Sequence, residues 1–362
     1  MISSKITPIE TVQFLNSEGE LVNFPYTIAE DTLIKSYESM WTARLVDERM
    51  LILQRQGSIT FAMSSLGEEA TAVGSAAALS IDDWMYPQYR EVGVIFYRGF
   101  TIQDYIHHMF GNEKDLILGR QMPNHFGSRA LNVVTVSSPI GTKIPHAAGA
   151  AYAMKLDKKD TVAICYFGEG ATSEGDFHAG LNLAAVRKAP AIFFCRNNGY
   201  AISTPVSKQF ASDGVASKGV AYGMEAVRVD GNDFFAVYWA TKKAKEHGLS
   251  GKGPYLIEAM TFRMGAHSSS DDPSAYRLEE DCKPWEGRCP ILRLRKYLER
   301  HNLWNEEKEL ALKNRIKKEI DEAIEKAKLT QDPPMERMIE NVYAEVPEHL
   351  KEELDRLKKE LE

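Results

Sequence analysis

Two groups of polar residues follow apolar runs at a spacing that could place them in one site. Glu169 stands between two glycines directly after the apolar run 162–167, and the pair Asn197-Asn198 follows the next apolar run, 191–195. A carboxylate and an amide oxygen are hard ligands, suited to Mg2+ that keeps its other positions for phosphate oxygens and water. The glycines let backbone amides approach an anion, and the N-terminus of the following helix favours a phosphate. These residue types predict a site for a magnesium diphosphate.

The elements that would position these residues alternate between strand and helix. Runs 162–167 and 191–195 predict buried strands, and residues 176–187 between them predict a helix. This order is typical of a parallel sheet, in which the carboxyl ends of adjacent strands meet at the edge where ligands bind. The pattern repeats at 227–230, 234–246 and 255–260. We therefore expect one α/β domain with a parallel sheet flanked by helices.

The two ends of the chain differ from this central part. Residues 1–30 alternate apolar and polar positions around a turn, which predicts an extended, peripheral arm. Segments 306–328 and 347–362 are rich in Glu, Lys and Arg of interleaved sign, which fits solvated helical faces. We expect an arm (1–30), an α/β domain (31–300) and a helical region (301–362) packed on the domain or on a partner. Two further helical stretches, 66–80 and 147–154, are rich in small residues, which favours tight core packing, with a subunit interface as the alternative.

Composition excludes several classes of protein. With 362 residues, 44% of them hydrophobic, the chain can bury a large core, which excludes a disordered or fibrous protein. A net charge of −7 without a basic stripe argues against nucleic-acid or membrane partners. No apolar run is long enough to span a bilayer, and the first residues do not form a leader pattern. The four cysteines have no close metal-binding spacing and are expected to be reduced, which predicts a cytosolic location.

The glycines alone say little, because Gly-x-Gly is common in structural turns. The combination with Asn197-Asn198 at crossover spacing is more specific and is typical of thiamine-diphosphate enzymes, in which an acidic residue and the second asparagine hold the metal. A dinucleotide-binding fingerprint fits less well, because residues 168–173 lack its third glycine and the next strand does not end in a ribose-binding acid.

The longer motifs resemble the alpha subunits of branched-chain 2-oxo acid dehydrogenase. The likeness is carried by residues 168–178 and 193–205, and it extends through 87–91, 122–127, 137–142, 229–233 and 267–272. It implies a thiamine-diphosphate-dependent oxidative decarboxylation, with acyl transfer to the lipoyl group of an acyltransferase. Arg196, Glu169 and the stretch 122–125 favour the branched-chain enzymes, and a pyruvate-type or broad-specificity subunit is the alternative. A non-catalytic scaffold would be expected to lose some of these residues.

The resemblance implies roles for individual residues at the metal and diphosphate. Glu169, Asn198 and the backbone carbonyl of Tyr200 would bind Mg2+. The diphosphate would be held by Tyr89, Arg90 and Arg196, with Gln88 nearby and backbone amides donated by Gly170 and Ala171. Arginine forks match phosphate oxygens, which agrees with these assignments.

The loop 137–143 would meet the other end of the cofactor. The resemblance places Ser138 and Ile140 at the pyrimidine ring, where Ile140 would prop the cofactor into a bent form; a core isoleucine is the alternative. The same loop resembles one that binds a structural potassium ion through Ser137, Pro139 and Thr142. Lys143 stands where the family often has an oxygen donor, so a retained potassium ion is doubtful.

His267 opens a segment dense in Ser, Asp and Pro, which is typical of a mobile loop. The resemblance implies that it lies over the diphosphate and takes part in acyl transfer to lipoamide. An unperturbed histidine titrates near neutrality, which suits an acid; an exposed histidine without function is the alternative. Ser268 matches a position that is phosphorylated in some members of the family.

The motifs around Glu169 and Asn197-Asn198 serve the diphosphate end of the cofactor. The pyrimidine ring needs a carboxylate to drive its tautomerism, and no second module in this chain is a convincing source of one. A beta subunit should therefore supply the glutamate, and the resemblance implies an α2β2 heterotetramer. This chain alone is expected to be nearly inactive.

Overall fold

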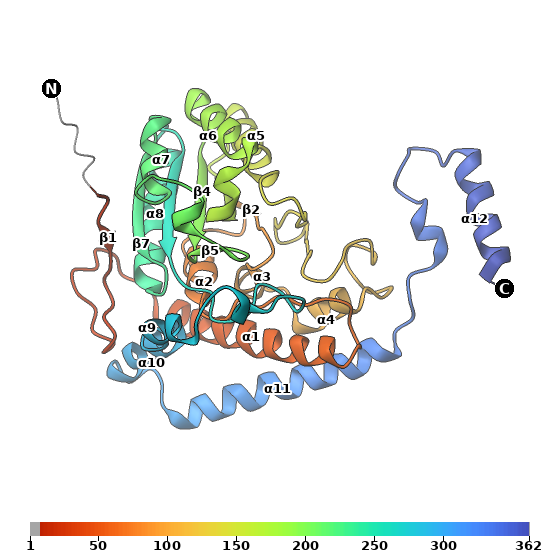
Figure 1. Ribbon diagram of the computed structural model, residues 1–362, viewed down its shortest axis with the longest axis horizontal. Helices are drawn as coiled ribbons and strands as arrows, with labels where there is room; N and C mark the ends of the chain where they lie inside the picture. The colour runs from red at the N-terminus through yellow and green to blue at the C-terminus, as the bar shows by residue number, and fades with distance from the viewer. Residues whose placement is uncertain (1–7, 362) are drawn as a thin grey trace.

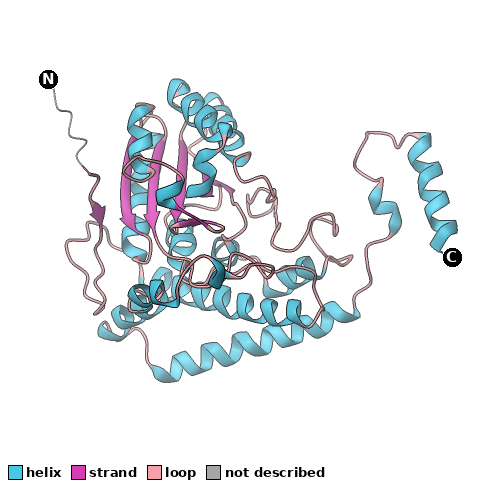
Figure 2. Cartoon of the chain, in the orientation of Figure 1, coloured by secondary structure: helices cyan, strands magenta, loops and turns pink. Residues whose placement is uncertain are grey.

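The computed structural model describes residues 8–361. Within these residues a six-stranded parallel sheet lies at the centre, in the order β1-β7-β8-β4-β3-β2, which confirms the expected α/β architecture (Figures 1 and 2). The strands of this sheet are β1 (Thr11–Val12), β2 (Trp84–Tyr86), β3 (Ala163–Gly168), β4 (Ala191–Asn197), β7 (Glu225–Asp230) and β8 (Tyr255–Met260). A separate antiparallel hairpin is formed by β5 (Tyr200–Ala201) and β6 (Thr204–Pro205).

Helices cover both faces of the sheet. The helices of the described residues are α1 (Glu30–Arg55), α2 (Glu69–Ala77), α3 (Val92–Arg98), α4 (Ile102–Phe110), α5 (Lys143–Leu156), α6 (Gly175–Arg187), α7 (Ala216–Ala221), α8 (Phe234–Leu249), α9 (Lys283–Glu286), α10 (Pro290–Arg300), α11 (Glu306–Leu329) and α12 (Glu348–Leu361). Helices α5, α6 and α7 cover one face, and α2 and α8 cover the other, backed by α1 and α3. Strands β3 and β4 are therefore mainly apolar, because both faces of the sheet are buried.

The alternation of side chains along each strand divides the core into two clusters. In β3, Ile164 and Tyr166 belong to the cluster under α2 and α8, whereas Cys165 and Phe167 belong to the cluster under α5 and α6. Cys165 and Cys195 are fully buried and unpaired, as expected of thiols that act as small hydrophobic residues. Helix α2 is buried along nearly its whole length, which confirms tight core packing there, while α5 buries only one side.

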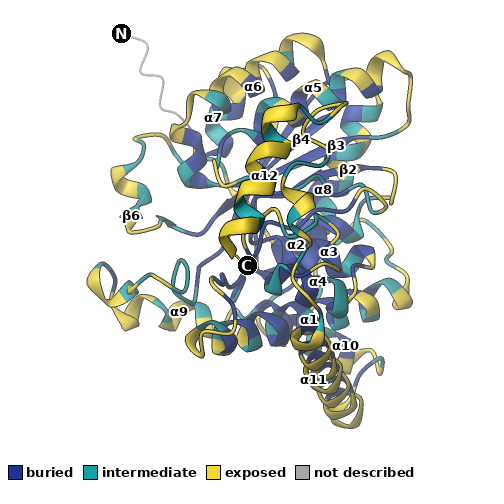
Figure 3. Ribbon diagram, turned by 90° about the vertical axis from the view of Figure 1, so that its right-hand side faces the viewer, coloured by how far each residue is buried: buried dark blue, intermediate teal, exposed yellow. Residues whose placement is uncertain are grey.

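The two ends of the chain are placed differently from one another. The arm is less peripheral than expected: β1 pairs with β7, and the Asp233 carboxylate accepts hydrogen bonds from the backbone N–H groups of Phe14 and Leu15 at 2.7 Å. Residues 1–7 of the arm lie outside the described residues. Helix α11 packs along α4 and α1, whereas α12 stands away from the sheet and is mostly exposed (Figures 1 and 3). In residues 8–361, no helix is long and apolar enough to cross a membrane.

Glu258 is a buried charge inside the sheet, next to the end of β4. It lies in β8 with none of its surface exposed. Its carboxylate accepts hydrogen bonds from the backbone N–H groups of Val215 and Ala216, at 2.8 and 3.0 Å, where α7 begins. It also accepts a bond from the Asn197 side chain at 2.8 Å and pairs with Nε of Arg228 at 3.0 Å. These partners replace water around the carboxylate and connect β8 to α7, β4 and β7.

We predict that Glu258→Ala lowers the free energy of unfolding by about 3–5 kcal/mol, because it leaves Nε of Arg228, the Asn197 side chain and the N–H groups at the start of α7 buried without their acceptor. Urea unfolding followed by circular dichroism measures this change. Glu225→Ala, at the exposed start of β7, is the control and should change stability by less than about 0.5 kcal/mol. Equal stabilities for the two variants would contradict the role given to Glu258.

Candidate functional site

The ends of β3 and β4 lie side by side, as the spacing of the two motifs predicts. Gly168 pairs with Arg196 in the parallel register of the two strands. Glu169 follows directly on β3, Asn198 follows on β4, and the Glu169 carboxylate accepts a hydrogen bond from the backbone N–H of Asn198 at 3.4 Å. The carboxylate and the amide are therefore delivered to the same edge of the sheet, which confirms the expected juxtaposition.

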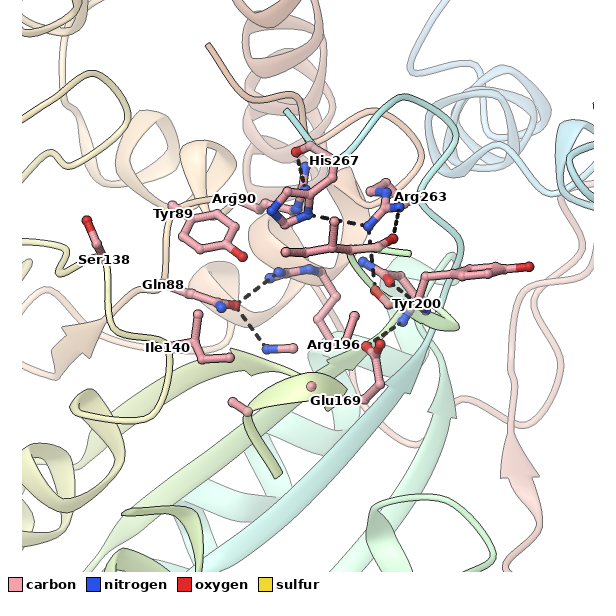
Figure 4. Close-up of a pocket in the computed structure, with 16 residues that line it drawn as sticks. Gln88, Tyr89, Arg90, Ser138, Ile140, Glu169, Arg196, Tyr200, Arg263 and His267 are labelled. Carbon is pink, nitrogen blue, oxygen red and sulfur yellow. Dashed lines mark hydrogen bonds between the residues drawn. The ribbon is translucent and has the colours of Figure 1, made fainter. Parts of the chain in front are cut away.

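A cavity of about 330 Å3 opens at this edge (Figure 4). Every residue that the sequence singles out for Mg2+ or thiamine diphosphate lines it. These residues are Gln88, Tyr89, Arg90, Ser138, Ile140, Glu169, Gly170, Ala171, Arg196, Asn198, Tyr200 and His267. The lining comes from the loops before α3 and α5, the ends of β3 and β4, the β5–β6 hairpin and the loop after β8. Segments far apart in the sequence thus form one site.

Glu169 is a carboxylate without a strong partner. It is 1% exposed, and burial raises its pKa. Its hydrogen bonds are long: Gln209 donates from Nε2 at 3.3 Å, and Asn198 donates from its backbone at 3.4 Å. A buried carboxylate requires a cation or strong donors to remain charged. Together with the Asn198 amide and the Tyr200 carbonyl, it fits the oxygen ligands of Mg2+.

Three guanidinium groups surround the cavity. Arg196 pairs with Glu91 through Nη1, and its Nη2 donates to Oε1 of Gln88 at 3.3 Å. Arg90 is buried, which lowers its pKa, and it donates to the backbone carbonyl of Ser64. Arg263 donates to the carbonyl of Ile202 at 2.7 Å. This concentration of donors fits an anionic ligand with several oxygens.

His267 is neutral in this arrangement. Nη2 of Arg90 donates to the His267 carbonyl at 2.5 Å and lies 3.1 Å from its Nδ1. Because a guanidinium only donates, Nδ1 is an acceptor and the ring proton sits on Nε2. Burial, Arg90 and Arg263 lower the pKa of His267 to about 4. The expectation that this histidine titrates near neutrality is therefore wrong, because its buried surroundings carry two positive charges.

The backbone amides next to Glu169 belong to a 3₁₀ turn. This turn runs from Glu169 to Ser173, whereas α6 begins at Gly175, beyond the cavity lining. The expectation that the long helix offers its N-terminus to the phosphates is therefore wrong. The candidate donors are the amides of Gly170 and Ala171 in the 3₁₀ turn.

The loop before α5 is held by its own polar groups. Ser138 is exposed, and its hydroxyl donates to Nε2 of His125 at 2.8 Å, since Nδ1 of His125 donates to the carbonyl of Pro123 at 3.0 Å. Ile140 is half-buried, packs against the α5–α6 cluster and lines the cavity.

The polar groups that the resemblance assigns to a potassium site form hydrogen bonds with one another. The hydroxyl oxygens of Ser137 and Thr142 are 3.0 Å apart, and the Thr142 hydroxyl donates to the carbonyl of Pro139 at 3.3 Å. Lys143 is buried, which lowers its pKa.

Three charged residues of the site were not predicted from the sequence. Arg263 lines the cavity, and Glu68 and Glu91 pair with the arginines behind it. Arg263 follows β8, the strand next to β4, so the strand-end reasoning used for Glu169 could have found it. Glu68 comes from the segment before α2 and has no such signal, and Glu91 follows β2, a three-residue strand that was not predicted from the sequence.

Comparison with known proteins agrees with this site. The family model "Dehydrogenase E1 component" matches residues 37–336. The subunit alpha 2 of mitochondrial 2-oxoisovalerate dehydrogenase from Arabidopsis thaliana is 47% identical over 342 residues, covering 94% of this chain and 72% of the relative. The human alpha subunit is 45% identical over 361 residues, covering 99% and 81%. The Caenorhabditis elegans subunit is 48% identical over 330 residues, covering 91% and 76%.

These relatives correct one expectation and confirm another. The predicted cytosolic location is contradicted, because the relatives are mitochondrial proteins. Unpaired cysteines argue only against an oxidising compartment and do not distinguish among the others. The resemblance to alpha subunits of branched-chain 2-oxo acid dehydrogenase is confirmed, and the chain belongs to the dehydrogenase E1 component family.

Proposed function

We propose that this chain is the alpha subunit of a thiamine-diphosphate-dependent 2-oxoisovalerate dehydrogenase. The enzyme would decarboxylate branched-chain 2-oxo acids oxidatively and pass the acyl group to the lipoyl group of an acyltransferase. The observation that supports this most is that all twelve residues expected at the metal and cofactor line one cavity. Because all twelve residues are present, a non-catalytic scaffold is disfavoured. The relatives are named as 2-oxoisovalerate dehydrogenases, which disfavours a pyruvate-type subunit.

We propose that Glu169, Asn198 and the Tyr200 carbonyl hold Mg2+ together with diphosphate oxygens. Among residues 8–361, no three His, Cys, Asp or Glu side chains cluster in a way that could hold a metal. A mixed set of one carboxylate, one amide and one carbonyl suits Mg2+, which commonly takes substrate phosphates and water as its other ligands. A potassium ion at residues 137–142 is not part of this proposal.

The remaining cavity residues would bind and orient the cofactor. Thiamine diphosphate, when bound, supplies the electron sink that decarboxylation requires. The guanidinium groups of Arg90 and Arg196 and the amides of the 3₁₀ turn would neutralise the diphosphate, with Gln88 and Tyr89 beside them. The negative charge of the diphosphate would raise the pKa of His267 again, so that this side chain can hold a proton near the lipoyl sulfur.

The other end of the cofactor would lie between Ile140, Ser138 and a partner. We propose that a beta subunit supplies the carboxylate for the pyrimidine ring in an α2β2 heterotetramer. The division into an arm (1–30), a thiamine-diphosphate-binding domain (31–300) and a helical region (301–362) remains a proposal; the family model continues past residue 300, to residue 336.

We predict that the complex with the beta subunit prefers 3-methyl-2-oxobutanoate to pyruvate by about 10–200-fold in kcat/KM, the range expected when a pocket distinguishes small apolar groups. Reduction of a dye by the co-purified subunits measures both rates. A preference for pyruvate would favour the pyruvate-type alternative. An intact heterotetramer that gives no heat with thiamine diphosphate and Mg2+ would favour the scaffold.

Glu169→Ala is expected to weaken Mg2+-dependent binding of thiamine diphosphate by more than about 100-fold, because even residues behind the ligands cost 10–100-fold. Calorimetry on the assembled subunits measures this. The fold should persist, since the hydrogen bonds of Glu169 are long. Glu174→Ala, exposed and outside the cavity lining, is the matched control and should bind normally. Retained activity of Glu169→Ala would refute the assignment.

For His267→Ala we expect a selective defect. Acylation of a lipoyl domain should fall by about 100–10,000-fold, the usual size of an acid-base contribution, while decarboxylation with an artificial dye should persist. The exposed His301→Ala is the control. Equal loss of both activities would argue against a role of His267 in transfer.

A further inference from the structure

Glu68 connects the proposed metal ligand to the arginines of the cavity. It is 1% exposed and does not line the cavity itself. Its Oε1 accepts a hydrogen bond from Nδ2 of Asn198 at 2.7 Å. Its Oε2 lies 3.3 Å from Nε of Arg196 and 3.9 Å from Nε of Arg90. One carboxylate therefore contacts a residue of the metal end and two residues of the diphosphate end.

The backbone of Glu68 is held on both sides. Its N–H donates to the carbonyl of Ser65 at 2.9 Å, and its carbonyl accepts from the Thr71 hydroxyl at 2.6 Å. The preceding Gly67 has φ +91° and would bring a Cβ within 2.7 Å of Met264, so only glycine fits this close approach. The backbone that carries the Glu68 carboxylate is thus fixed beside Asn198.

The contact with Glu68 decides which way the Asn198 carboxamide points. An amide can turn by 180° and exchange its oxygen for its NH2 group. A carboxylate only accepts hydrogen bonds, so Asn198 must direct Nδ2 to Glu68 and Oδ1 away from it. Oδ1 accepts from the backbone N–H of Tyr200 at 3.2 Å, on the side of the proposed metal ligands. The reversed amide would present two hydrogens where a cation needs an oxygen.

We propose that Glu68 is a positioning residue that fixes Asn198 with its oxygen turned toward the cation. This inference rests on the proposed function, because it assigns Asn198 to the metal. At the metal, Glu68 would act only by orienting Asn198. At the diphosphate, it would act through the negative charge that it places beside Arg196 and Arg90.

The test combines Glu68→Gln with Asn198→Asp. In Glu68→Gln the new amide can donate to Asn198, which releases the carboxamide to turn; the affinity for Mn2+ at saturating thiamine diphosphate should fall by about 10–100-fold. In the double variant the amide introduced at position 68 can donate to one oxygen of the carboxylate introduced at position 198, while the other oxygen faces the metal. The total charge equals that of the wild type, so Mn2+ affinity should return to within about threefold of it.

Asn198→Asp alone provides an independent outcome. Its carboxylate would face the Glu68 carboxylate where the two side chains now lie 2.7 Å apart, so Mn2+ binding should weaken although a charged ligand is added. This variant tests the contact even where Glu68→Gln fails to fold or to assemble. Tighter Mn2+ binding by Asn198→Asp would overturn the proposal.

Glu91→Gln is the matched control, since Glu91 is 2% exposed and pairs with Arg196 but has no contact with Asn198. Adding Asn198→Asp should not rescue it. Electron paramagnetic resonance of Mn2+ in the complex with the beta subunit measures all variants. Unchanged affinity in Glu68→Gln, or a double variant as weak as Glu68→Gln, would overturn the role of Glu68. A wild type that does not retain Mn2+ with thiamine diphosphate would instead overturn the proposed function.

Discussion

The parallel register of β3, β4 and β8 is the constraint on which the rest of the site depends. Because the three strands run in the same direction side by side, their carboxyl ends deliver Glu169, Asn198 and Arg263 to one edge. Glu258 reinforces this edge from inside the sheet, since it binds the side chain of Asn197 and pairs with Arg228. A shift of β4 by one residue would turn its alternating side chains to the opposite face and separate the carboxylate from the amide.

Charge balance follows from that placement. Arg196 is surrounded by Glu68 and Glu91, so its charge is compensated within the protein. The Nε of Arg90, at 3.9 Å from Glu68, is less closely paired, and its Nη groups donate to backbone carbonyls. Arg90 and Arg263 line the cavity, where burial and the charges of these two arginines lower the pKa of His267. An anion bound there would offset the part of that shift that comes from Arg90 and Arg263, so the same charges that would bind a diphosphate also influence the protonation of the histidine.

The sequence predicted those parts of the fold and of the site that a local pattern of residues determines. Apolar runs predicted β3 and β4 within one or two residues, and strand-end logic placed Glu169 beside Asn198. It did not find the contacts of Glu68, because these depend on how the segment before α2 approaches β4 in three dimensions. The low pKa of His267 was missed for the same reason, since it comes from burial and from Arg90 and Arg263, which are distant in sequence or were not expected in the site.

Burial along the cavity changes from one end to the other, and this gradient supports the inference of a partner subunit. Glu169, Arg196 and Asn198 at the strand ends are at most 4% exposed. Ser138 is exposed, as is Met122 beside it, which leaves 43% of its surface to solvent, and Ile202 in the β5–β6 hairpin leaves 54%. Large apolar side chains around an open site are typical of a surface that another molecule covers. Decarboxylation chemistry also requires that water be excluded from the reacting end of the cofactor. The deep polar end is complete within this chain, and the apolar end is where we infer that the beta subunit completes the site.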